Sequence, residues 1–159
     1  MPRVTGRITV ACVGRLRAAH WREAQDDYVG RLKHYVALEV TEVKDSVGRG
    51  LPDATAMERE GELLIAAMAG ASRRIALMAT GRLMDSATLA AFLQRQIETY
   101  GHLAFAIGGP VGLSDAVASA CQETLALSPL TFPHELARVI LLEQLYRAMT
   151  ILKGESYHK

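Results

Sequence analysis

The stretch LAFAIGGPVGLS, residues 103–114, joins an apolar run to a glycine-rich turn and decides the class of fold. The run at 103–107 predicts a strand, and Ser114 or Asp115 can begin a short helix after the turn. A strand that passes through a turn directly into a helix is the repeating step of a parallel α/β sheet. We therefore expect the same alternation on both sides of this stretch.

Working outward from it, strands and helices alternate along the whole chain. The apolar run at 8–13 predicts a strand buried on both faces, and the alternating run at 38–43 predicts a more exposed strand. Further strands are predicted at 74–78, 103–107 and 124–127. Helical periodicity predicts helices at 19–35, at 55–69, from 85 or 86 to 100, from 114 or 115 to 121, and at 133–152. This order predicts an α/β fold with a mainly parallel sheet and helices on both faces. With 159 residues and no linker or repeat, one domain covering 1–159 is expected.

Single residues mark the expected starts of two of these helices. Thr55 and Glu58 have the spacing of a capping box at the start of the second helix. Pro133 is expected to be the first residue of the last helix, because the N–H that proline lacks has no partner at that position.

Composition and charge place the chain among soluble globular proteins, with 50% hydrophobic and 22% charged residues. Residues 1–34 carry a charge of +4 and residues 35–159 carry −3. The basic region can contact phosphates, although a solvated helix start explains the same count. Cys12 and Cys121 lie in apolar surroundings outside any Cys/His cluster, which predicts buried free thiols and no metal site. No signal-peptide or membrane-spanning run is visible, so a cytoplasmic protein with no membrane partner is expected.

Three loops follow predicted strands and are candidates for a ligand site, because open α/β sheets bind ligands at the carboxyl ends of their strands. The turn at 108–112 brings backbone N–H groups close to a ligand, but it matches neither GxGxxG nor a P-loop. A tight strand-to-helix turn explains it equally well. The loop at 127–133 combines backbone groups with apolar walls and suits a flat heterocycle such as adenine, with a buried connector as the alternative. The loop at 77–81 says little by itself.

The last predicted helix is too apolar to have a single buried face. Twelve of the seventeen residues from 136 to 152 are apolar, so the helix is expected to be covered on more than one side, as at a subunit interface. Arg138 and Arg147 point to nearly opposite sides of this helix. Because arginine is rarely buried without a partner, the alternatives are an interface salt bridge or an anionic ligand such as a phosphate.

Taken together, these stretches resemble the RlmH family, the SPOUT-class methyltransferases that act on large-subunit ribosomal RNA. The likeness is nearly full length and is carried by ITVACVGRL (8–16), EGELLI (60–65), IGGPVGLS (107–114), LSPLTFPHELARVILLEQLYRA (127–148) and KGESYHK (153–159). The resemblance implies an α/β sheet whose C-terminal part is tied in a trefoil knot, a homodimer, and S-adenosyl-L-methionine as cofactor. The cofactor-binding residues that it implies are Leu77, Gly108, Leu127, Ser128, Pro129, Leu130, Thr131 and Phe132.

The resemblance also implies the reaction, which is methylation of N3 of a pseudouridine in large-subunit (23S) ribosomal RNA on the assembled ribosome. His158 is the candidate proton acceptor because imidazole titrates near neutral pH, and Tyr157 is the candidate platform for the base. Arg138 is expected to help position the substrate. The terminal motif is expected to reach the cofactor of the partner subunit.

RNA contacts are expected from five basic residues, namely Arg15, Arg17, Arg22, Lys153 and Lys159. His134, in the first turn of the last helix, is interpreted as a capping or packing residue. Two rival functions stay open from sequence. One is another SPOUT enzyme that methylates transfer RNA, and the other is a non-catalytic homologue that binds RNA or the ribosome.

Overall fold

The computed structural model describes residues 4–159. Its strands are β1 (Arg7–Val13), β2 (Ala37–Val43), β3 (Arg73–Leu83), β4 (His102–Ile107) and β5 (Glu123–Ala126). Its helices are α1 (Ala19–Leu32), α2 (Asp53–Ala67), α3 (Ser86–Tyr100), α4 (Asp115–Ala120) and α5 (His134–Leu152). Every strand and helix predicted from the sequence is present, in the predicted order.

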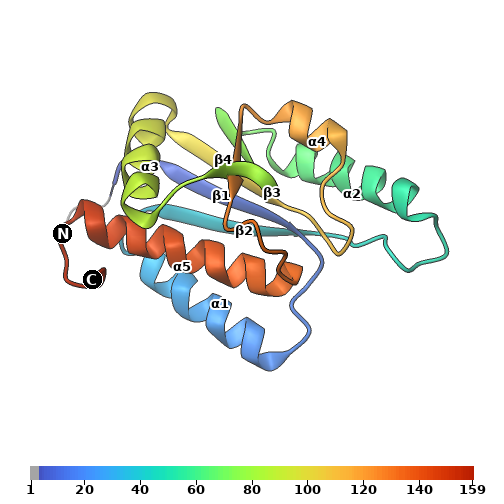
Figure 1. Cartoon of the computed structure of the whole chain (residues 1–159), viewed down its shortest axis with the longest axis horizontal. Helices are drawn as coiled ribbons and strands as arrows, with labels where there is room; N and C mark the ends of the chain where they lie inside the picture. Colours follow the sequence, from blue (N-terminus) through green and yellow to red (C-terminus); the bar gives the residue numbers. More distant parts are fainter. Residues whose placement is uncertain (1–3) are drawn as a thin grey trace.

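The five strands form one parallel sheet in the order β2-β1-β4-β3-β5, with helices on both faces. One face packs against α1, α3 and α5 through a large apolar core, and the other packs against α2 and α4 through a smaller one. Helix α5 lies beside both α1 and α3 (Figure 1). Its apolar surface is therefore covered on more than one side within a single chain, as its composition predicted.

The burial of the strands follows their places in the sheet. Strand β1 is central and is buried from Ile8 to Val13, as its unbroken apolar run predicted. Strand β2 lies at the edge and keeps exposed positions, in agreement with its alternating pattern. The carboxyl ends of the parallel strands meet at one edge of the sheet. Residues 77–81 of β3 and the loops that follow β4 and β5 therefore come together there.

Two predicted helix starts need correction. Helix α2 begins at Asp53, directly after Pro52, and has no side-chain cap. The capping box at Thr55 and Glu58 is therefore wrong, because both residues lie inside the helix. Pro133 does not begin α5 but occupies the position before its first residue, where its extended backbone (ψ 143°) turns the chain into the helix.

Strand β3 is longer than predicted because the chain leaves the sheet and returns to it. Leu125 of β5 pairs with Leu77 and again with Arg82, so residues 78–81 bulge out between two contacts with one partner. Gly81 permits this close crossing, since a Cβ atom there would lie 2.7 Å from the carbonyl carbon of Leu125. The bulge of β3 therefore packs closely against strand β5. The trefoil knot and the homodimer stay predictions.

Two further expectations concern cysteines and the membrane. Cys12 is buried and Cys121 is half-buried, and both thiols are free. Within residues 4–159 no cluster of histidine, cysteine and acidic side chains is placed to hold a metal ion. No helix in the same range has the length and apolarity needed to span a membrane.

Candidate functional site

A cavity of about 390 Å³ opens where the bulged part of β3 meets the loops after β4 and β5, and we call it the three-loop cavity. It also includes the first turn of α5, which follows the third loop. Its lining residues are Leu77, Met78, Ala79, Thr80, Ile107, Gly108, Gly109, Pro110, Val111, Gly112, Leu113, Leu127, Ser128, Leu130, Thr131, Phe132, His134 and Ala137. Its volume lies in the range of small-molecule sites, which are mostly apolar with a few polar groups.

The predicted cofactor residues fall almost entirely within this cavity. Leu77, Gly108, Leu127, Ser128, Leu130, Thr131 and Phe132 line it, whereas the exposed Pro129 does not. Met78, Ala79 and Thr80 of the candidate loop at 77–81 line it as well, in the bulge of β3. Sequence reasoning missed His134 and Ala137, which lie in the first turn of α5.

The glycine turn gives the cavity a wall made of backbone. A Cβ atom on Gly108 would lie 2.6 Å from the carbonyl carbon of Gly112, which is far too close for any side chain. Gly112 has φ 86°, a conformation that glycine adopts without strain. Below the turn, buried Glu60 accepts hydrogen bonds from the backbone N–H groups of Ser46 and Val47. Within the turn, the N–H of Gly112 donates a 3.0 Å hydrogen bond to the carbonyl of Gly109, and residues 108–112 line the cavity.

The loop after β5 supplies the opposite wall. The Ser128 hydroxyl accepts a hydrogen bond of 3.0 Å from the N–H of Leu130, which holds the loop in a compact turn. Leu130 is 70% exposed, although it is a large apolar residue at the rim of the cavity. An exposed leucine beside an apolar cavity provides surface that a ligand can cover.

Two more cavities continue from the three-loop cavity toward the N-terminal arginines. A connecting cavity of about 190 Å³ shares Pro110 and His134 with the three-loop cavity. A third cavity of about 720 Å³, which we call the arginine cleft, is lined by Arg15, Leu16, Arg17, Arg22, Gln25, Asp26, Glu42, Asp45 and Arg49. The connecting cavity and the cleft share Arg15, Arg17 and Asp45. The three cavities thus form a continuous series of neighbours.

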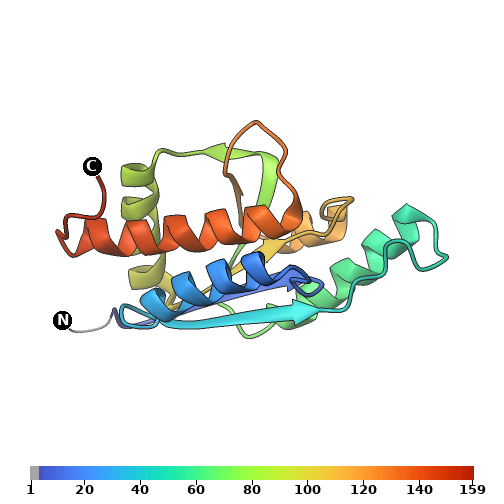
Figure 2. The same cartoon turned by 90° about the horizontal axis from the view of Figure 1, so that it is seen from below.

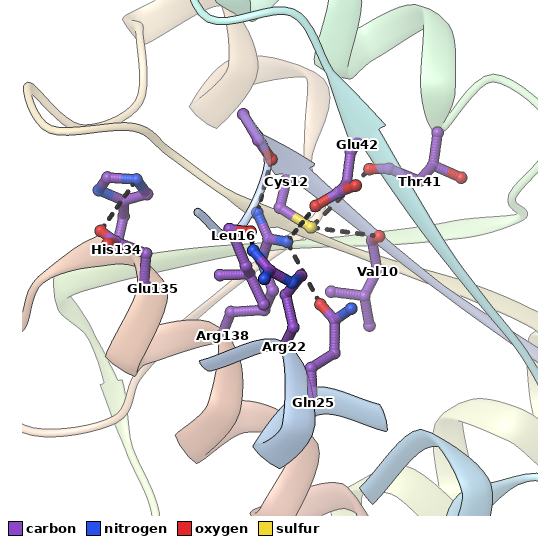
Figure 3. Close-up of polar contacts among 11 residues, drawn as sticks. Val10, Cys12, Leu16, Arg22, Gln25, Thr41, Glu42, His134, Glu135 and Arg138 are labelled. Carbon is purple, nitrogen blue, oxygen red and sulfur yellow. Dashed lines mark hydrogen bonds and ion pairs between the residues drawn. The ribbon is translucent and has the colours of Figure 1, made fainter. Parts of the chain in front are cut away.

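Arg138 lies beside this series but is 1% exposed. Figure 3 shows its guanidinium among groups from three other parts of the chain. It forms a 2.6 Å ion pair with Glu42 and donates to the side chain of Gln25 and to the carbonyl of Gly14. Its partner is therefore a carboxylate of the same chain. Arg138 ties the end of β1 to α1 and β2.

The last residues of the chain fold back onto their own helix α5. The Tyr157 hydroxyl donates a 3.0 Å hydrogen bond to Glu143, and its ring packs edge-on against Tyr146. Arg147 donates two hydrogen bonds to the same Glu143 oxygen and lies 3.2 Å from Nδ1 of His158. Burial and the hydrogen bond to Glu143 raise the pKa of Tyr157 to about 12. The tail is held by these contacts and is not a frayed end.

This arrangement decides the tautomer of His158. Arginine has no acceptor atom, so the Nδ1 atom of His158 accepts from Arg147, and a neutral ring carries its proton on Nε2. The tail also lies at the far end of α5 from the three-loop cavity (Figures 1 and 2), and the 19 residues of that helix span about 28 Å. The structure therefore brings Tyr157 and His158 together, but not near the cavity of their own chain.

Comparison with known sequences adds the family. A family model described as "Predicted SPOUT methyltransferase" matches residues 7–158. Relatives named "Ribosomal RNA large subunit methyltransferase H" from Gemmatimonas aurantiaca and Sorangium cellulosum are 44% and 45% identical to this chain. These matches cover 96% and 95% of this chain, and 99% and 98% of the relatives. The chain belongs to the RlmH family of SPOUT methyltransferases.

Solved structures of low sequence identity share the fold of this RlmH-family chain. A probable methyltransferase from Bordetella pertussis superposes with a TM-score of 0.59 at 15% identity, covering 92% of this chain and 98% of that one. A probable methylase family protein from Haemophilus influenzae gives 0.58 at 13% identity, covering 96% and 70%. At such identities the likeness concerns the fold alone.

Three of the stretches that resembled the RlmH family occupy two separate places in the structure, whereas ITVACVGRL runs along β1 and EGELLI lies in α2. IGGPVGLS and the stretch that begins at Leu127 build the three-loop cavity, and KGESYHK forms the tail at the other end of α5. The loop after β5 and the tail are joined in sequence by α5, but in the structure they lie at opposite ends of that helix.

Proposed function

We propose that this chain uses S-adenosyl-L-methionine to methylate N3 of a pseudouridine in large-subunit ribosomal RNA, acting as a cytoplasmic homodimer on the assembled ribosome. The observation that carries the proposal is the three-loop cavity, which lies at the carboxyl ends of the strands, where open α/β sheets bind ligands. Relatives over nearly the full length are named as large-subunit ribosomal RNA methyltransferases, which supports methylation of that RNA.

The cavity fits the proposed cofactor in size and in chemistry. A volume of about 390 Å³ is enough for a nucleoside-sized ligand. The side chains of Leu77, Leu127 and Phe132 would contact the apolar parts of the adenosine. The backbone of the turn at Gly108 and of residues 128–131 would supply hydrogen bonds to its polar edge, because neither segment is part of a helix or strand. Pro129 has no N–H to donate and is proposed to shape the loop only.

When bound, S-adenosyl-L-methionine supplies an electrophilic methyl group on a sulfonium centre. The chain's own residues have to orient the target base and remove the proton from its N3 atom, because an imide nitrogen is a poor nucleophile until it is deprotonated. His158 is the proposed acceptor through one of its ring nitrogens, and Tyr157 the proposed contact for the base. Both must first leave the contacts with Arg147 and Glu143 described above.

The position of the tail supports a shared site between two subunits. Because about 28 Å of helix separates the tail from the cavity of its own chain, Tyr157 and His158 are proposed to serve the cavity of the partner subunit. Arg138 is buried, and both terminal nitrogens of its guanidinium group donate to partners within the chain, so its proposed role in positioning the substrate is indirect. It would act by holding the loop that carries Arg15 and Arg17.

Two measurements test the proposal. Calorimetric titration with S-adenosyl-L-methionine tests whether the protein binds the cofactor. To test the reaction, ribosomes that lack the methyl group are incubated with the enzyme and the cofactor, and their ribosomal RNA is analysed by mass spectrometry. We expect one new methyl group on one pseudouridine. Absence of cofactor binding even with ribosomes present would refute the function and favour an inert homologue.

Two variants test the tail separately. His158→Ala and Tyr157→Phe should each lower the turnover number while leaving cofactor affinity within about twofold of the wild type. Normal turnover in both variants would show that neither residue takes part in the reaction, whatever the measured cofactor affinity.

A further inference from the structure

The arginine cleft has no part in the cofactor site, yet it is joined to it. Only the connecting cavity, about 190 Å³ in volume, lies between the two. Pro110 and His134 border the connecting cavity on the three-loop side, and Arg15 and Arg17 border it on the cleft side. A polymer whose reacting group enters the three-loop cavity would therefore have its neighbouring groups over the cleft.

The charge of the cleft is positive after its internal pairs are counted. Four arginines and three carboxylates line it, and one of these carboxylates, Glu42, is already neutralised by buried Arg138. Two carboxylates then remain against four arginines, which leaves two uncompensated positive charges. Such a surplus in a concave surface attracts anions.

The four arginines have different tasks. Arg22 donates to the backbone carbonyls of Leu16 and Arg17, so its guanidinium is used to brace the loop between β1 and α1. Arg138 braces the same loop from below through the carbonyl of Gly14. Arg15 is exposed and has no hydrogen bond or ion pair to any residue within 4–159. The loop is thus held rigidly while its outward arginine is available.

Arg17 and Arg49 are available in a different way. Both contact the single carboxylate of Asp45, Arg49 at 3.2 Å and Arg17 at 3.8 Å. The side chain of Arg49 is 52% exposed and that of Arg17 is 81% exposed. Burial alone would raise the pKa of Asp45, but the hydrogen bond from Arg49 and the charges of both arginines outweigh it and lower the pKa. Asp45 therefore remains ionised and holds the two guanidinium groups near each other, each with donors left over for a second anion.

We propose that the arginine cleft is a phosphate-binding subsite for the RNA backbone next to the target nucleotide, with Arg15, Arg17 and Arg49 as the contacting residues. The inference rests on the proposed function, because it takes the substrate to be RNA. Guanidinium groups suit phosphate because their planar fork matches two phosphate oxygens. Arg22 is reassigned from RNA contact to loop support, and Arg49, which sequence reasoning missed, is added.

The test uses the full-length enzyme and ribosomes from a strain that lacks the methyl group. Arg15→Gln, Arg17→Gln and Arg49→Gln are compared singly and together with the control Arg95→Gln. Arg95 is an exposed arginine on α3 that lines none of the three cavities. The measured quantities are KM for ribosomes between 50 and 200 mM salt, kcat at saturation, and the Kd for S-adenosyl-L-methionine by calorimetry.

Each single variant should raise KM about fivefold, as expected for loss of an exposed ion pair, and the triple variant about a hundredfold. The slope of log KM against log salt should become shallower by about 2 in the triple variant, at about 0.7 for each phosphate contact to single-stranded RNA. Both kcat and the cofactor Kd should stay within about twofold of the wild type. Arg22→Gln should raise KM with the slope unchanged, because Arg22 donates to carbonyls and not to phosphates.

Two results would overturn the proposal. One is a triple variant whose KM and salt slope equal those of Arg95→Gln. The other is a parallel loss of cofactor affinity, which would make the arginines part of the cofactor site. Failure of the proposed function would be visible separately, since the wild type would then neither bind the cofactor nor transfer a methyl group.

Discussion

Gly108→Ala is expected to damage the three-loop cavity through a single added methyl group. Gly108 is the first residue of the turn after β4, and a Cβ atom there would lie 2.6 Å from the carbonyl carbon and 2.8 Å from the carbonyl oxygen of Gly112. Both atoms are backbone, so no side chain can rotate away to make room. The whole turn up to Leu113 has to move.

The size of the effect follows from the geometry. Ordinary contact begins at about 3.4 Å, so the turn must shift by about 0.8 Å. Forced overpacking of this kind costs about 3 kcal/mol of unfolding free energy. A misplacement near 1 Å in a binding wall can also cost about two orders of magnitude in function, so we expect cofactor affinity to fall about a hundredfold.

Two matched variants carry the same substitution with smaller expected effects. Gly109→Ala meets only side-chain atoms, with Val13 at 3.1 Å and Glu60 at 3.3 Å, so it should cost about 1 kcal/mol. Gly30→Ala lies in α1 with nothing within 4 Å, so it should raise the unfolding free energy by about 0.5 kcal/mol. The three variants thus form a series from severe to slightly stabilising.

The assay combines urea unfolding at one protein concentration with calorimetric titration of S-adenosyl-L-methionine. A fixed concentration is needed because association of subunits contributes to apparent stability. If Gly108→Ala unfolds at the same urea concentration as Gly30→Ala and binds the cofactor with wild-type affinity, the turn is not a rigid wall and the reasoning fails.

Three other predictions concern parts of the chain away from the turn. Arg138→Met should lower the unfolding free energy by about 3 kcal/mol, measured by urea unfolding. A double-mutant cycle with Glu42→Gln should show a coupling energy above about 1 kcal/mol, and additive effects would contradict the buried ion pair between Arg138 and Glu42. Deletion of residues 157–159 should abolish methyl transfer in mass spectrometry with cofactor affinity retained, and an active truncated enzyme would make the tail dispensable. The Tyr35 hydroxyl donates a 2.6 Å hydrogen bond to Glu155, which raises the pKa of Tyr35 to about 12. Because Tyr35 and Tyr157 both have raised pKa values, the folded state keeps protons that the unfolded state has lost, so the unfolding free energy should fall as pH rises from about 10 to about 12. Replacing both tyrosines by phenylalanine should flatten this fall, and an unchanged pH profile would contradict the assignment.

Local patterns in the sequence predicted most of the fold. The apolar run of β1 predicted a buried strand and the alternation of β2 predicted a more exposed one, because burial on two faces or on one restricts which residues fit. Helix starts were less certain. Thr55 and Glu58 satisfy a capping pattern, but the helix begins earlier, where Pro52 already provides the turn that a cap would have to make.

The walls of the three-loop cavity could be predicted because they follow strands, whereas the residues beside the cavity, around Arg138 and in the arginine cleft, could not. Gly108 and the loop at 127–132 could be found from strand ends and a family likeness. The pairing of Arg138 with Glu42 joins residues 96 positions apart, and no local pattern contains it. Arg49 likewise enters the cleft only because Asp45 and the fold of its loop place it opposite Arg17.

The crossing of β3 over Leu125 has a consequence for how the protein folds. Strand β5 makes contact on both sides of the bulge at residues 78–81, so it can settle only once that bulge has formed around it. Residues 77–80 at this bulge also line the three-loop cavity. A chain in which β5 had not paired on both sides of the bulge would therefore lack one wall of the cavity, even with its helices in place. Ligand binding thus depends on the completion of this crossing.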